Sequence, residues 1–145
     1  IEIFIAGRIV KEERASFLTA LSDLKSDRRD IAIIYLDEFV AYAALAPMFL
    51  NSDCILLPYI ESEASSGLLG HAALYERPVI GTDYGLIGCL IRRYELGIAI
   101  KNIDAVKLAR AIADFLAITY SPCRFFQTEY QSLRAMLLSL LGYCC

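Results

Sequence analysis

Residues 54–82 read CILLPYIESEASSGLLGHAALYERPVIGT, and this stretch decides the fold. An apolar run ends at Pro58, a polar loop follows, a glycine opens a segment with helical periodicity, and a second apolar run begins at Pro78. A short apolar run bounded by turn residues is typical of a buried strand. The stretch is therefore predicted to fold as strand, helix and strand, with the polar loop at the carboxyl end of the first strand.

The same alternation of strand and helix extends along the whole chain. Strands are predicted over residues 2–6, 31–35, 54–57, 78–81 and 97–100. Helices are predicted over residues 11–25, 39–50, 66–76, 86–95 and 104–116, and a final amphipathic helix over 124–141. The strands are uniformly apolar, as expected when helices cover both faces of a parallel sheet. We therefore expect one α/β domain with an open parallel sheet flanked by helices, of Rossmann-like type.

Composition narrows the possible partners. The net charge of −3 gives no basic footprint for nucleic acid. The hydrophobic content of 57% suits buried strands or a surface that meets a missing partner. The longest apolar stretch, residues 39–50, is too short to span a bilayer. The five cysteines show no CxxC pair and no metal-ligand spacing with the single histidine, so a reducing, cytosolic setting is expected. No cofactor and no metal are predicted.

Ligands of open parallel sheets bind outside the carboxyl ends of the strands. The candidate site therefore lies in four loops, residues 7–11, 36–39, 59–67 and 82–88. The last of these either borders a ligand pocket or is a simple turn from strand to helix.

The third loop carries the clearest chemistry. Ser65 and Ser66 precede Gly67 at a helix start, where free backbone N–H groups and the helix dipole favour an anion such as a diphosphate. Glu63 could accept hydrogen bonds from hydroxyl groups, and His71 lies one turn into the helix. A phosphate and a polyol held side by side suggest a sugar nucleotide. The alternatives are an ordinary helix cap and a histidine that is simply packed in the core.

Residues 51–116 also resemble the donor-binding half of GT-B glycosyltransferases, in particular the group-1 (GT4) family. The similarity lies in an aspartate-led strand, a Pro-Tyr turn, the loop and helix of a Glu-x7-Glu motif, a Pro-Val-Ile strand, and a closing Gly-led strand before a helix. The resemblance covers nearly half of the chain in collinear order. It implies the C-terminal, donor-nucleotide domain of such an enzyme.

The resemblance assigns roles to individual residues. Glu63 corresponds to the motif's first glutamate, which binds the hydroxyls of the donor sugar. The resemblance therefore implies a catalytic role for Glu63. His71 stands where the second, ribose-binding glutamate is expected, which departs from the family pattern. The implied donor-binding residues in this loop and helix are Glu63, Ala64, Ser65, Ser66, Gly67, Leu68 and His71. The amides of Ser66, Gly67 and Leu68 are expected to meet the diphosphate.

The first loop raises the question of register. Arg8 and Lys11 could be the Arg/Lys pair with which the family neutralises the leaving diphosphate, or the solvated start of a helix. The number of residues between this first loop and Pro58 leaves room for one intervening βα unit, whereas the family pattern requires two. Residues 1–7 are therefore expected to correspond to the family's second strand. The first βα unit and the N-terminal acceptor domain are then expected to lie upstream. In this register the nucleotide base lies near Gly7, Arg8, Leu36, Asp37 and Phe39.

The function implied by the resemblance is retaining, metal-independent transfer from a nucleoside-diphosphate sugar, most often a UDP-sugar such as UDP-glucose. The acceptor is the hydroxyl of a glycan or lipid-linked sugar in polysaccharide synthesis. The expected location is cytoplasmic, with peripheral contact at the inner face of the membrane. The 145-residue chain is expected to bind the donor without turnover.

Two other functions compete with this one. The domain could be a non-catalytic sugar-nucleotide-binding or scaffold module, with His71 marking lost catalysis. It could also be a flavodoxin-like or receiver-type signalling domain, because Asp37 and Glu38 follow a strand. Against a receiver domain, no lysine follows the later strands at a suitable position. The sequence also contains no phosphate-binding GxxxxGK[ST] loop, which argues against a P-loop nucleotidase.

Overall fold

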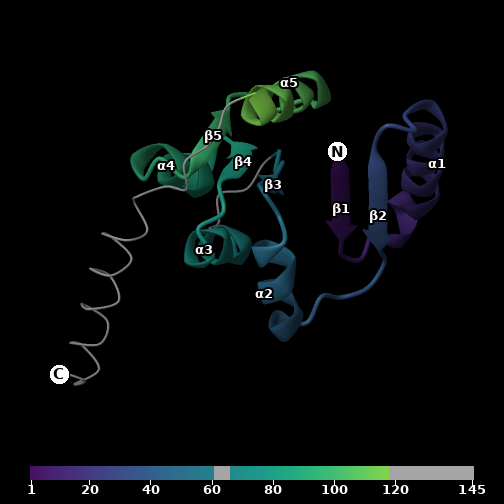
Figure 1. Cartoon of the computed structure of the whole chain (residues 1–145), viewed down its shortest axis with the longest axis horizontal. Coiled ribbons are helices and arrows are strands. Elements are labelled where there is room, and N and C mark those ends of the chain that lie inside the picture. Colours follow the sequence, from purple (N-terminus) through teal and green to yellow (C-terminus); the bar gives the residue numbers. More distant parts are fainter. Residues whose placement is uncertain (61–65, 118–145) are drawn as a thin grey trace. The chain divides into compact units, whose positions relative to one another are not determined.

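The computed structural model describes residues 1–60 and 66–117, and strand and helix alternate throughout them. The predicted last helix, residues 124–141, lies outside the described residues. The described strands are β1 (Glu2–Ala6), β2 (Ala32–Leu36), β3 (Ile55–Leu57), β4 (Val79–Thr82) and β5 (Gly97–Ile100). The described helices are α1 (Lys11–Asp27), α2 (Tyr42–Leu50), α3 (Gly67–Leu74), α4 (Gly85–Arg93) and α5 (Ala105–Ala117) (Figure 1).

The chain forms two compact units. The first unit is Ile1–Leu45 and the second is Ala46–Cys145. All described strand pairs are parallel, but they form two sheets, β1–β2 in the first unit and β3–β4–β5 in the second. The α/β class with parallel sheets and flanking helices is confirmed, and it is compatible with a Rossmann-like fold. The single open sheet predicted from the sequence is not what the described strands form.

In the first unit, α1 packs on one face of the two-stranded sheet. The rings of Phe17 on α1 and Tyr35 on β2 have centroids 5.1 Å apart, and Ile33 is buried. The side chains on the other face include Phe4 and Ile34, which are register partners and are 43% and 44% exposed. Within the described residues, this face of the two-stranded sheet is therefore only partly covered, whereas helices were expected on both faces.

In the second unit, helices cover the two faces of the sheet. On one face, Ile80 and Ile100 pack with Ala111 of α5, and Cys54, Leu56, Ile98, Ile103, Leu108, Ile112 and Phe115 surround them. The other face carries Leu57 and Gly81, next to Ile91 of α4. Leu57, Val79, Ile80, Ile87 and Ile91 are the largest apolar side chains that are fully buried. The core of the second unit is therefore what positions the carboxyl ends of β3, β4 and β5.

The packing of this core leads to a prediction about two thiols. Burial raises the pKa of the Cys54 thiol to about 12, whereas Cys89 on α4 is exposed. Because the thiolate is the nucleophile, iodoacetamide at pH 8 should alkylate Cys89 rapidly and Cys54 only after denaturation. Peptide-resolved mass spectrometry over time would measure both rates. Equal rates in the native protein would contradict the described packing of Cys54.

Candidate functional site

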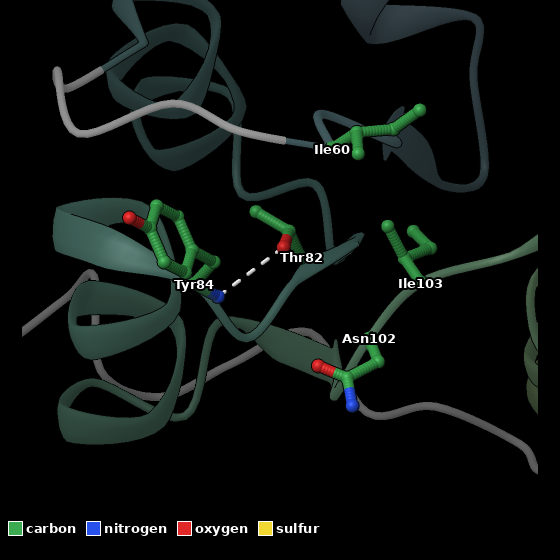
Figure 2. Close-up of a pocket in the computed structure, with 5 residues that line it drawn as sticks. All are labelled: Ile60, Thr82, Tyr84, Asn102 and Ile103. Atoms are coloured by element: carbon green, nitrogen blue, oxygen red, sulfur yellow. Dashed lines mark hydrogen bonds between the residues drawn. The ribbon is translucent and has the colours of Figure 1, made fainter.

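A pocket of about 380 Å³ lies at the carboxyl ends of the strands of the second unit. It is lined by Ile60 from the loop after β3, Thr82 and Tyr84 from the end of β4 and its turn, and Asn102 and Ile103 from the loop after β5. Figure 2 shows Ile60 across the open space from Asn102, with Tyr84 and Ile103 on its two other sides. This volume falls within the range of about 300–1,000 Å³ typical of small-molecule sites. The location is the one expected for a ligand of a parallel sheet.

The turn after β4 is held by contacts on both sides of Tyr84. Thr82 is 2% exposed, and its Oγ1 accepts a hydrogen bond from the Tyr84 N–H at 3.2 Å (Figure 2). Arg92 of α4 forms an ion pair with the Asp83 carboxylate, and its guanidinium also donates to the Asp83 carbonyl at 3.4 Å. Gly88 lies so close to Asp83 that a Cβ there would stand 2.3 Å from the carbonyl carbon of Asp83. The backbone that presents Tyr84 is therefore fixed.

The loop after β5 is also held in place. Asn102 has a positive φ of 49°, and its carbonyl accepts a hydrogen bond from the Lys107 ammonium at 2.7 Å. The Asp104 carboxylate accepts from the Lys107 N–H at 2.8 Å, which caps the start of α5. This backbone hydrogen bond, followed by the Lys107 side chain, lowers the pKa of Asp104. Two charged residues, Asp104 and Lys107, therefore fix this loop of the pocket by pairing with each other.

The start of α3 is close in sequence to this pocket. Ser66 is the N-cap of α3, and its Oγ accepts from the Leu68 N–H at 3.2 Å. The Ser66 hydroxyl also lies 3.2 Å from the Tyr59 hydroxyl, which ties the loop after β3 to the helix start. The helix cap weighed in the sequence analysis is thus present. Because the Leu68 amide already donates to Ser66, the amides of Ser66 and Gly67 are better placed to meet an anion.

His71 lies among aromatic rings. Its ring centroid is 5.8 Å from that of Phe49 on α2, and it stacks on Tyr75 at 6.2 Å with an interplanar angle of 10°. Phe49 and Tyr75 also contact each other, with centroids 5.9 Å apart. This environment favours the packing role that the sequence analysis set beside ligand binding. The predicted contact of His71 with ribose stays a prediction.

The remaining predicted site residues divide between the first unit and the undescribed loop. In the first unit, the Gly7 N–H donates to the Leu36 carbonyl at 3.1 Å, and Gly7 has a φ of 140°, which favours glycine. Asp37 forms an ion pair with Arg14 of α1. Arg8 and Phe39 are both exposed. The structure therefore brings Gly7, Leu36 and Asp37 to the same end of the first sheet.

Glu63, Ala64 and Ser65 lie outside the described residues, so their predicted contacts stay predictions.

Several residues of the site were not singled out from the sequence. Tyr59, Ile60, Thr82 and Tyr84 belong to candidate loops but were given no individual role, although Tyr59 contacts Ser66 and the other three line the pocket. Asn102 and Ile103 follow β5, and that loop was not among the four candidates. A signal was present, because the sequence KNID places an asparagine between a strand and a helix, and asparagine tolerates a left-handed backbone. The rule of carboxyl ends applied to all five strands would have included it.

Metal and membrane signals are not found in the part of the chain that the structure describes. Residues 1–60 and 66–117 hold no group of three or more potential metal ligands. Within the same ranges, every helix is too short or too polar to cross a bilayer.

A comparison with models of known protein families gives no match, and a comparison with curated proteins gives none either. The resemblance to GT-B glycosyltransferases therefore rests on the motif pattern alone.

Proposed function

We propose that the chain is the donor-binding domain of a glycosyltransferase and binds a nucleoside-diphosphate sugar. The observation that carries this proposal is the pocket at the carboxyl ends of β3, β4 and β5 together with the capped start of α3, where the Ser66 hydroxyl lies 3.2 Å from the hydroxyl of Tyr59 in the loop after β3. The pocket offers space for a small polar ligand, and the helix start offers backbone amides to an anion. A sugar nucleotide combines both kinds of group.

Individual residues are proposed to bind different parts of the donor. The diphosphate meets the amides of Ser66 and Gly67, which would also stabilise charge that grows on the leaving group. The Glu63 carboxylate accepts hydrogen bonds from the hydroxyls of the sugar.

The proposed reaction is metal-independent transfer with retention to an acceptor hydroxyl, with a UDP-sugar as donor. It belongs to the assembly of a polysaccharide or lipid-linked glycan, at the cytoplasmic side of a membrane.

Calorimetric titration with UDP, GDP, UDP-glucose and GDP-mannose tests the proposal. We expect one base to be selected and its sugar nucleotide to bind more tightly than the free diphosphate. Glu63→Ala should weaken binding of the sugar nucleotide about tenfold, because a hydrogen bond to a charged group is lost. Asp114→Ala, which removes an exposed carboxylate of α5, is the matched control and should leave binding unchanged. Absence of binding by all four ligands would refute the proposal.

The aromatic environment of His71 favours a second candidate, a sugar-nucleotide-binding module without catalysis. If His71 only packs, His71→Glu should lower stability and leave donor affinity unimproved, because it places a charge among aromatic rings. Sugar transfer by the protein, measured with a radiolabelled donor, separates the enzyme from the non-catalytic module.

A further inference from the structure

The turn after β4 carries an unusual residue for its position. Tyr84 is the N-cap of α4, a position at which Ser, Thr, Asp and Asn are preferred because their side chains accept a hydrogen bond from the helix start. The Tyr84 side chain makes no such bond, and it is 48% exposed at the edge of the pocket. The ring therefore contributes neither a cap nor a buried core contact to α4. Residues that break a local rule in this way often serve a ligand.

The loop on the opposite side of the pocket is a turn that contains Asn102. Asn102 has a φ of 49°, a left-handed conformation that asparagine readily adopts in turns. Its carbonyl accepts a hydrogen bond from the Lys107 ammonium, so the backbone there is held in place. The turn therefore presents the Asn102 carboxamide at the edge of the pocket (Figure 2).

The charges around the pocket limit what it can hold. The five described residues that line the pocket are uncharged, and the nearby Asp83 and Asp104 carboxylates are paired with Arg92 and Lys107. An anionic group in the pocket would lose its hydration without gaining a cation among these described side chains. Tyr84, Ile60 and Ile103 offer apolar surface, and Thr82 and Asn102 offer hydrogen-bonding groups. A neutral sugar ring has one apolar face and hydroxyl groups around its edge. It therefore matches both the apolar surface and the hydrogen-bonding groups of the pocket.

We propose that this pocket binds the sugar of the donor as a neutral hexose, stacked on the Tyr84 ring, and that it selects against sugars that carry a carboxylate. The inference rests on the proposed function and names the class of donor sugar. Asn102 forms hydrogen bonds to the hydroxyls of the hexose through its carboxamide. Tyr84 is thus a specificity-determining residue for the donor.

The first experiment measures the affinities of UDP, UDP-glucose and UDP-glucuronic acid by calorimetry. If GDP is the preferred nucleotide, the equivalent set is GDP, GDP-mannose and GDP-mannuronic acid. We expect the neutral sugar to improve affinity over the diphosphate and the uronic acid to give no improvement. Tyr84→Ala should reduce the affinity for UDP-glucose about threefold to tenfold and leave that for UDP unchanged, and Tyr84→Phe should behave as wild type. Equal affinity for both sugars, or full affinity in Tyr84→Ala, would overturn the inference.

A second variant separates binding from folding. Tyr84→Ser supplies a good N-cap, so its Tm should rise while the contribution of the sugar to binding is lost. A lower Tm would show that the ring supports the fold, which would contradict a ligand-binding role.

A parallel measurement distinguishes failure of this inference from failure of the proposed function. Methyl glucoside and sodium glucuronate at high concentration are titrated into ¹⁵N-labelled protein, and the amide shifts of Thr82, Tyr84 and Asn102 are followed. Shifts with the glucoside but no binding of any nucleotide would refute the proposed function and support the pocket. Nucleotide binding without a sugar contribution would support the function and refute the pocket assignment, and silence in both experiments would refute both.

Discussion

Gly97→Ala should unfold the second unit or lower its stability by about 4 kcal/mol or more, which is the range of exceptional single substitutions. Gly97 begins β5 and is the register partner of Val79 on β4. A Cβ at this position would stand 2.0 Å from the Val79 carbonyl oxygen and 2.6 Å from its nitrogen. The φ of 147° also lies where residues other than glycine rarely occur. Val79 cannot move away from the added Cβ, because both contacts are to its backbone atoms within the sheet.

Urea denaturation followed by circular dichroism would measure this loss, with Gly70→Ala as the matched control. Gly70 lies inside α3, and a Cβ there would meet nothing within 4 Å. The control should therefore gain about 0.5–1 kcal/mol from the better helix propensity of alanine. If Gly97→Ala were as stable as Gly70→Ala, the described approach of β5 to β4 would be wrong.

Gly88→Ala should have the next largest effect, a loss of about 3 kcal/mol or more. Gly88 lies in the second turn of α4, and a Cβ there would stand 2.3 Å from the carbonyl carbon and 2.5 Å from the oxygen of Asp83. The helix would have to move away from the turn, which would disturb the pairing of Arg92 with Asp83. Because this turn presents Tyr84, the substitution should weaken sugar binding as well as folding.

The same denaturation measurement applies to Gly88→Ala, joined by calorimetry with UDP-glucose on the fraction that remains folded. Cys89→Ala changes the neighbouring, exposed position on α4 and should leave both stability and binding near wild type. A stable Gly88→Ala protein with normal donor affinity would contradict the role given to this contact.

Much of the fold could be predicted because local signals agree with the packing. The strands lie within about one residue of their predicted positions, since short apolar runs between turn residues have few alternatives. The start of α2 was predicted three residues too early, at Phe39 rather than Tyr42. Periodicity alone could not reject Phe39, because its aromatic side chain suits a helix face even though it is exposed here.

What the sequence could not give was the pairing of strands between βα units. An apolar strand has the same sequence pattern whether both of its edges or only one of them is hydrogen-bonded to a neighbour. Residues 1–45 therefore contain no signal that distinguishes one sheet of five strands from two smaller sheets. The site shows a similar limit. The cap at Ser66 follows from a serine before a glycine-led helix. The aromatic neighbours of His71 come from α2 and from the end of α3, and only the fold brings Phe49 to that position.

The most direct test of the central claim is to locate donor binding on the protein by ¹H–¹⁵N correlation spectra during titration with UDP-glucose. The account predicts the largest shifts at the carboxyl ends of the second sheet, at the amides of Gly67, Thr82, Tyr84 and Asn102. Amides at the far end of α1, such as that of Lys25, should not shift. Shifts concentrated away from these strand ends, or a spectrum unchanged by sugar nucleotides of either base, would contradict the claim that this chain is a sugar-nucleotide-binding domain.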